Sequence, residues 1–153
     1  MRKLVIVVTA LALVFAGYWF AGARAMSGAV AAWFEQRTAE GWVAEYAALE
    51  TSGFPARFET RLTDVMLADP ETGVAWSAPF FAIRARSARP TRFEALWPRE
   101  QTIASPAERI RIAADRFDGV VALVPDTALA LRSAELDLGT VSLDSTAGWR
   151  AGG

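Results

Sequence analysis

The 153-residue sequence contains no cysteine and no histidine. Without cysteine it has no disulfide, thiol nucleophile or zinc–thiolate site. Without histidine it lacks the side chain that most often transfers protons near neutral pH, and the commonest metal ligand. The G-x-S-x-G turn and glycine-rich phosphate loops are also missing, so a catalytic triad is excluded. The only lysine is Lys3. We therefore predict that the protein is not an enzyme and has no catalytic, cofactor-binding or metal-binding residue.

The sequence also lacks an excess of positive charge. It has 16 basic and 17 acidic residues, a net charge of −1. Setting aside Arg2 and Lys3 leaves 14 basic against 17 acidic residues, a net charge of −3. Nucleic-acid binding needs a dense positive surface, so we predict no nucleic-acid partner. The length corresponds to one domain that is large enough to bury a core.

One long apolar run is present, from Leu4 to Ala23, directly after Arg2 and Lys3. A helix rises about 1.5 Å per residue, so this run spans roughly 30 Å, the thickness of the hydrocarbon core of a bilayer. The positive start predicts a cytoplasmic N-terminus, with the rest of the chain on the far side. We predict a signal anchor over residues 1–25, in the inner membrane, and a periplasmic location for the bulk of the chain.

A cleaved signal peptide is the alternative for this segment. Ala23-Arg24-Ala25 fits the small-x-small rule for cleavage after Ala25. The apolar run is longer than the usual core of a signal peptide, and helical composition continues beyond it, which favours an uncleaved anchor. Both interpretations place the remaining residues outside the cytoplasm.

A juxtamembrane helix is predicted over residues 26–41, ending at Gly41. Its side chains recur at the i, i+3, i+4, i+7 spacing of a helix face at Val30, Trp33, Phe34 and Arg37. We expect the Trp-Phe pair to pack on the domain. Placement on the lipid surface is the alternative.

From residue 42 onward the apolar side chains recur every 2 residues, as in a strand, and no longer every 3.6 residues, as in a helix. Residues 57–64 alternate between apolar and polar side chains, as do Phe81, Ile83 and Ala85 against the arginines between them. Turns recur mostly every 8 to 11 residues, at prolines 55, 70, 79, 90, 98 and 106. We predict a mainly β fold in which residues 42–153 form a curved antiparallel meander, an open or incomplete sheet. With no closing element after residue 145, more sheet or another chain is expected to cover the last edge.

Two tight hairpins are predicted within this meander. Asp118-Gly119 suits a type I′ turn, and Gly139-Thr140 suits a type II′ turn. The second turn would pair Leu138 with Val141 and Leu136 with Leu143. This pairing would explain why the apolar side chains occupy even positions before Gly139 and odd positions after it.

Three stretches resemble a known family: "SGFPARFETRLTD" (52–64), "DPETG" (69–73) and "RPTRFEALWPREQTIASP" (89–106). They are similar to the alphaproteobacterial domain of unknown function 2125, whose members have an N-terminal membrane segment, a G-[FY]-P-x-R-F corner and a W-P-x-x-Q segment. The matching residues are Gly53, Phe54, Pro55, Arg57, Phe58, Trp97, Pro98 and Gln101.

This resemblance covers roughly residues 1–149 and departs at Ala88, where the family tends to have tyrosine. Family members are typically longer, so we expect this chain to correspond to an N-terminal portion or a truncated relative. The family has no established catalytic residues, so the resemblance implies a location and a fold more than an activity. More loosely, the arrangement is similar to AsmA-like envelope proteins, which present a curved β-groove to lipids.

Several side-chain groups are weak candidates for chemistry. The Asp115–Gly119 stretch lacks the ligand pattern of a calcium loop and is interpreted as a turn. Nothing in the sequence brings together the carboxylates of Asp64 with Asp69 or of Glu94 with Glu100. The arginines at 84, 86, 89 and 92 form either a solvated outer face, which we favour, or a patch for lipid phosphates. The tryptophans at 42, 76, 97 and 149 are expected mostly in the core, with the remainder lining an apolar groove.

These features predict a membrane-anchored, non-enzymatic protein. Its long alternating sheet needs a partner for the apolar face, so we expect it to bind or shelter lipid or another amphiphile there. The alternative is an envelope scaffold or assembly protein that binds another protein through an exposed sheet edge.

Overall fold

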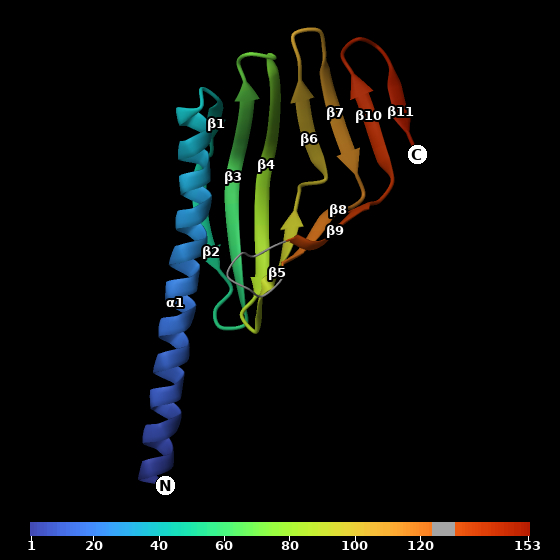
Figure 1. The fold of residues 1–153 in the computed structure, drawn as a ribbon. Helices are drawn as coiled ribbons and strands as arrows, with labels where there is room; N and C mark the ends of the chain where they lie inside the picture. The colour runs from blue at the N-terminus through green and yellow to red at the C-terminus, as the bar shows by residue number, and fades with distance from the viewer. Residues whose placement is uncertain (124–130) are drawn as a thin grey trace.

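The structure is a computed structural model that describes residues 1–123 and 131–153. One helix stands along the edge of one curved antiparallel sheet (Figure 1). The helix α1 spans Arg2–Ala39. The strands are β1 Val43–Glu45, β2 Ala48–Ser52, β3 Arg57–Asp69, β4 Val74–Arg86, β5 Arg89–Leu96, β6 Glu100–Ala104, β7 Arg109–Ala114, β8 Phe117–Leu123, β9 Leu131–Leu138, β10 Val141–Ser145 and β11 Arg150–Gly152. The predicted fold class, mainly β with an N-terminal helix and an open sheet, is confirmed.

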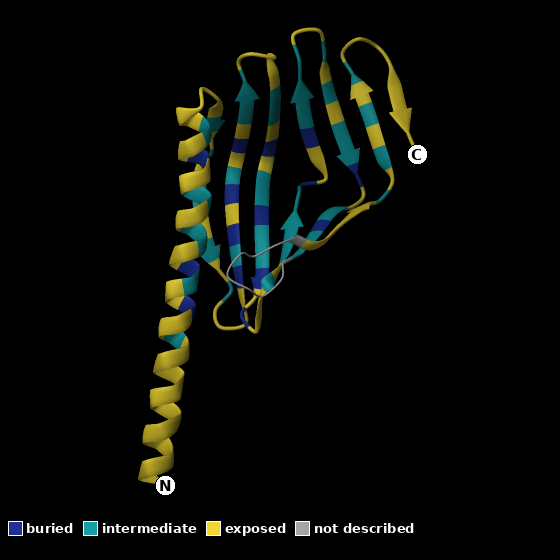
Figure 2. Cartoon of the chain, viewed as in Figure 1, coloured by how far each residue is buried: buried dark blue, intermediate teal, exposed yellow. Residues whose placement is uncertain are grey.

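Helix α1 covers both predicted N-terminal segments without a break. It contains no proline, and its end has a physical cause at Gly41, whose φ is +93°. The amide of Gly41 donates to the carbonyl of Thr38 (3.1 Å) and that of Trp42 to the carbonyl of Arg37 (3.0 Å), a Schellman motif. The N-terminal half of α1 extends beyond the sheet and is exposed there (Figure 2). The helix is long and apolar enough to cross a membrane, a property that signal sequences share.

The sheet is an antiparallel meander in which some partners are hairpin neighbours and others, such as β5 with β8 and β7 with β10, lie farther apart in the chain. Strand β3 pairs with β4 along nearly its whole length, from Arg57 opposite Arg86 to Asp69 opposite Val74. Strands β1 and β2 pair with β3 on its other side. Strands β5 and β6 share the far side of β4, and β8 and β7 pair with them in turn. The predicted antiparallel meander is therefore observed.

A line of interruptions, which we call the crease, crosses the whole sheet. It passes through Tyr46–Ala47, Asp64, Pro79, Trp97–Arg99, Asp115–Arg116 and Gly139–Thr140, where strands end or pairing skips a residue. Hydrogen bonds nevertheless continue across it, from Asp115 N to Thr140 O and from Gly139 N to Arg116 O, both 3.1 Å. Strands β7 and β8 are therefore two halves of one bent strand, and β9 and β10 are the two halves of its partner.

In β3 and β4 the crease comes from one extra residue in each strand. Asp64 has φ +49° and is skipped in the pairing, and the residue facing it, Pro79, has no N–H to donate. As a result Leu62 and Val65, three residues apart, both point into one apolar cluster with Phe34. In an unbroken strand they would face opposite sides. The extra residue keeps the apolar side chains on one face while the sheet bends.

The crease shows that both predicted hairpins are wrong. Asp118 and Gly119 lie within β8, where Gly119 pairs with Ala95 and Leu136. Gly139-Thr140 joins the two halves of a bent strand. Leu138 therefore pairs with Phe117 and not with Val141, whose partner is Ala114, and Leu136 and Leu143 pair with Gly119 and Ile112.

The C-terminal stretch also differs from expectation. Residues 146–148 form a turn in which Gly148 has φ +93° and the Ser145 amide donates to the Trp149 carbonyl (3.1 Å). Strand β11 follows and pairs with β10. The expectation that no closing element follows residue 145 is therefore wrong.

Candidate functional site

The Gly53-Phe54-Pro55-Ala56-Arg57-Phe58 stretch, which we call the corner, joins β2 to β3 and holds α1. Gly53 has φ +103°, and its carbonyl accepts from the Arg57 amide (3.0 Å). Trp19 Nε1 of the helix donates to the Arg57 carbonyl (2.8 Å), and the Trp19 ring stacks on Phe58 with centroids 5.6 Å apart. A Cβ on Gly22 would lie 2.9 Å from Phe58 Cζ, so only glycine permits this approach without a shift. The corner is a docking site for the helix.

Beyond the corner, residues 57–64 form part of the wall of the sheet. Thr60 and Leu62 are fully buried there, and Phe58 is 5% exposed. Val65 follows after the crease and continues the same buried surface. Phe34 of α1 packs against Leu62 and Val65, as expected for the Phe of the Trp-Phe pair. Trp33, at 42% exposed, lies at the margin of that contact.

A groove of about 640 Å³ lies between α1 and the sheet. Its lining residues are apolar throughout: Met26, Ala29, Val30, Trp33 and Phe34 of α1, Leu62, Val65 and Leu67 of β3, Trp76, Phe81 and Ile83 of β4, Phe93, Ala95 and Trp97 of β5 and the break after it, and Val121 of β8. Its volume falls in the range of sites that hold small molecules, about 300–1,000 Å³. The groove is therefore the strongest candidate site in the described part of the chain.

Aromatic rings form much of the groove wall. Trp97 packs against Phe81 and Phe117, with ring centroids 5.2 Å apart in both contacts. The indole N–H of Trp76 donates to Oε1 of the buried Gln101 (2.9 Å), so the ring presents an apolar face without an unsatisfied polar atom. Gln101 Nε2 has no hydrogen-bond partner within the described residues.

The four predicted tryptophans divide between two environments. Trp76 and Trp97 line the groove, as expected for some of the tryptophans. Trp42 is 37% exposed and Trp149 is 39% exposed. Trp149 Nε1 donates to Glu108 Oε2 (2.8 Å), which ties the β10–β11 turn to the start of β7. These two side chains therefore have no place in the groove.

The four predicted arginines do not form one patch. Arg84 pairs with Glu59 (2.9 Å) and lies 4.0 Å from Glu94. The other three, Arg86, Arg89 and Arg92, line a depression of about 250 Å³ with Glu94, near the turn between β4 and β5. All three are exposed.

The carboxylates of Asp64 and Asp69 both belong to β3, one inside the strand and one at its end. Asp69 accepts from the Thr72 hydroxyl (2.8 Å) and the Glu71 amide (2.9 Å), and these hydrogen bonds lower the pKa of Asp69. Asp64 sits in the crease. Asp118 lies inside β8 and Asp115 lies in the break before it, so the Asp115–Gly119 stretch does not form the predicted turn. Within residues 1–123 and 131–153, no cluster of three acidic side chains is placed to hold a metal ion.

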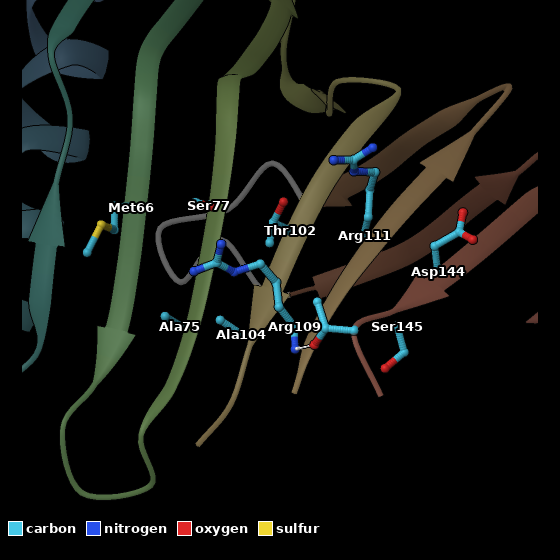
Figure 3. A pocket seen from close by; sticks show the side chains of 10 residues that line it. Met66, Ala75, Ser77, Thr102, Ala104, Arg109, Arg111, Asp144 and Ser145 are labelled. Carbon is cyan, nitrogen blue, oxygen red and sulfur yellow. Dashed lines mark hydrogen bonds between the residues drawn. The ribbon is translucent and has the colours of Figure 1, made fainter. Parts of the chain in front are cut away.

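A second hollow, of about 590 Å³, lies where small side chains meet arginines (Figure 3). Ala75, Ser77, Thr102 and Ala104 form its floor between Met66 and the pair Arg109 and Arg111. The backbone amide of Arg109 donates to Thr146 Oγ1 (2.9 Å). Met66, Ser77, Thr102, Arg111 and Asp144 form one continuous row of cross-strand partners. Such a row of polar and small side chains is typical of the outer face of a sheet.

The comparisons with known proteins agree with the resemblance seen in the sequence. No curated protein and no solved structure matches the chain. Residues 19–152 match the model of one protein family. This match includes the corner, the groove and the crease, and it begins at Trp19, the helix residue that docks on the corner. The chain belongs to that family, the uncharacterised proteins conserved in bacteria known as DUF2125.

Proposed function

We propose that the protein is a membrane-anchored, non-enzymatic binding protein that holds the acyl chain of a lipid or similar amphiphile in the groove. The observation that carries this proposal is the uniformly apolar lining of a cavity of about 640 Å³ next to a helix able to span a bilayer. Cavities that bind polar metabolites place several polar groups around the ligand. This groove offers an acyl chain a surface without such groups.

The width of the sheet explains why the groove exists. A helix is about 10 Å across and strands lie about 4.8 Å apart, so one helix covers roughly two strands. Helix α1 contacts β1, β2 and β3. Phe81, Ile83 and Phe93 lie farther along the same face, on β4 and β5, and remain only partly buried. The apolar face is wider than the helix that covers it, and an amphiphile would complete its burial.

The proposed anchor is retained and not cleaved after Ala25. Trp19 and Ala23 are buried against Phe58, and the Tyr18 hydroxyl donates to the carbonyl of Ser87 (3.3 Å). Cleavage would remove these residues and expose Phe58. With Arg2 and Lys3 in the cytoplasm, the helix crosses the inner membrane and the sheet stands in the periplasm.

The energetics favour sheltering over extraction. The groove and the hydrocarbon core of a bilayer are both apolar, so moving an acyl chain from one to the other changes its hydration little. Releasing the chain into water costs about 0.8 kcal/mol per methylene. A chain in the groove is therefore protected from water and returns readily to the membrane.

Photocrosslinking tests this proposal. The full chain is placed in nanodiscs whose phospholipid carries a diazirine on the acyl chain, and labelled peptides are mapped by mass spectrometry. We expect labelling on β4 and β5, around Phe81 and Phe93, in addition to the anchor. Labelling confined to residues 4–23 would contradict the proposal, because it would show that acyl chains stay in the bilayer.

Two matched variants sharpen the experiment. Ala95→Trp places a large ring inside the groove, because Ala95 lines it. Ala104→Trp places the same ring in the second hollow. The first variant should lose labelling of β4 and β5, and the second should keep it.

An exposed edge supports the scaffold alternative. In the described residues β9 pairs only with β8, and Leu136 and Leu138 on it are 58% and 46% exposed. An edge strand with exposed apolar side chains is suited to pairing with a strand of another protein. In-cell crosslinking from position 136 tests this function. One abundant protein partner there, together with an unlabelled groove, would favour a scaffold over a lipid-binding protein.

A further inference from the structure

We propose that the end of the sheet nearest the anchor docks on the membrane surface, where Arg57, Arg86, Arg89 and Arg92 bind the phosphates of anionic lipid headgroups. These four arginines are called the arginine rim below. The proposal rests on the anchor of the proposed function but not on the groove.

The contacts between α1 and the sheet set the height of the rim. Trp19 donates to the backbone carbonyl of Arg57, and Tyr18 donates to that of Ser87, in the turn between β4 and β5. Both helix residues belong to the apolar run that ends at Ala23. At about 1.5 Å per residue, Tyr18 lies roughly 8 Å below the end of the run. The rim residues begin β3, end β4 and begin β5, so their backbone is held roughly 8 Å to the hydrocarbon side of the boundary between hydrocarbon and headgroups. Long arginine side chains can extend from such a position to the headgroups.

An exposed aromatic side chain gives independent support for this height. Phe54, at the tip of the corner, is 52% exposed, although it is a large apolar residue. Its ring stacks on that of Phe20, with centroids 6.2 Å apart, and Phe20 is itself 64% exposed within the apolar run. The corner thus continues the lipid-facing surface of the anchor, in the zone where aromatic rings are favoured.

The charges of the rim fit a phosphate surface. Arg57 stands directly opposite Arg86, and Arg86 directly opposite Arg89, so three positive side chains occupy neighbouring cross-strand positions. Like charges in such positions repel each other unless an anion lies between them. Glu59, 3.7 Å from Arg57, and Glu94, beside the other three, offset only part of this charge. Guanidinium groups match the geometry of phosphate oxygens, which favours lipid phosphates as the partner.

Depth measurement by spin labelling tests the proposal, and the lack of native cysteine makes single labelling simple. Ala88→Cys, in the turn between Arg86 and Arg89, carries a nitroxide in the full chain in nanodiscs. With about one third phosphatidylglycerol in the bilayer, we expect the label to be protected from a water-soluble nickel chelate. In pure phosphatidylcholine we expect weaker protection, because only the contacts with α1 then hold the turn near the bilayer.

Two triple variants identify the cause. Arg86→Gln, Arg89→Gln and Arg92→Gln together should reduce protection at position 88 in the anionic bilayer to the level seen in pure phosphatidylcholine. Arg99→Gln, Arg109→Gln and Arg111→Gln remove the same charge from the other half of the sheet and should leave it unchanged. All six side chains are exposed, so tryptophan fluorescence should show that both variants stay folded.

A label at position 10, in the middle of the apolar run, separates two kinds of failure. If position 10 is protected but position 88 gives the same exposure in both lipids and in both variants, the rim does not bind headgroups and this inference is overturned alone. If position 10 is exposed to the chelate, the anchor is wrong and the rim proposal falls with it.

Discussion

Replacing Phe58 by alanine should detach α1 from the corner without unfolding the sheet. The ring is 5% exposed and stacks on Trp19, so its removal creates a cavity between helix and sheet. Core Phe→Ala changes cost about 3–5 kcal/mol. Phe54, in the same corner, is 52% exposed, so Phe54→Ala removes only about half of a buried ring, worth about 1 kcal/mol. The difference of at least about 2 kcal/mol corresponds to roughly a 30-fold change in the opening equilibrium.

Hydrogen exchange on the full chain in nanodiscs measures that opening. The amide of Arg57 donates to Gly53 and that of Ser87 to Ala56, and both report on the corner. We expect these amides to exchange at least about 30 times faster in Phe58→Ala than in Phe54→Ala. Amides in β6 and β7 should be unaffected. Equal rates in the two variants would refute the reasoning, because the helix would then not be held through Phe58.

A double-mutant cycle checks the same contact from the helix side. Gly22→Ala adds a Cβ that would lie 2.9 Å from the Phe58 ring, and overpacking of this kind costs about 1–3 kcal/mol. In a Phe58→Ala background the ring is gone, so the added methyl group should cost nothing. The two changes should therefore be strongly non-additive. Additive effects would show that Gly22 and Phe58 do not meet.

Three further predictions concern the crease, a turn and the groove wall. Asp64 has φ +49°, so Asp64→Gly should be neutral or stabilising in denaturant unfolding, whereas Asp64→Val should cost about 1–2 kcal/mol. Hydrogen bonds from Thr72 and the Glu71 amide lower the pKa of Asp69 below 3.8, so its contribution to stability is present above that pH and lost as pH falls through the lower folded-state pKa. Thr72→Val should raise this pKa toward 3.8 in an NMR titration. Gln101→Leu leaves the partly buried indole N–H of Trp76 without its protein partner and should lower stability by about 1 kcal/mol, a loss that Trp76→Phe in the same chain should partly restore.

Structural features that depend on a few neighbouring residues, such as the end of the helix, were predictable from the sequence. The crease was not. Gly41 ends the helix through a Schellman motif whose requirement for positive φ is local. The apolar positions shift from even to odd numbers between Leu138 and Val141. A two-residue hairpin and a bend in one long strand would both give this shift. Only the partners tell the two apart, and they lie some 20 residues or more away, at Phe117 and Ala114. A matching three-residue step from Ala114 to Phe117 is the sequence signal that would have identified a bend shared by both strands.

The sequence predicted an apolar groove as the candidate site, but it did not predict which residues line it. Alternation predicted an apolar face, and the tryptophans predicted a groove, yet Trp76 and Trp97 have no local feature that separates them from Trp42 and Trp149. Likewise, Trp19 fits the aromatic belt of a membrane anchor. Its partner, the carbonyl of Arg57, lies 38 residues later in the chain. A tryptophan that faces lipid and one that faces protein have the same local sequence.

In the proposed membrane placement, the docked corner would determine where the groove meets the membrane. On α1 the groove begins at Met26 and reaches Trp33, three to ten residues beyond the end of the apolar run. At about 1.5 Å per residue, this corresponds to roughly 5 to 15 Å above the hydrocarbon. The headgroup layer on each side of a bilayer is about 5–8 Å thick, so in this placement the groove would open within that layer and extend past it. An acyl chain would enter without crossing bulk water only while the corner holds the sheet at this height. Phe58→Ala should therefore reduce acyl-chain crosslinking on β4 and β5 even though Phe58 does not line the groove.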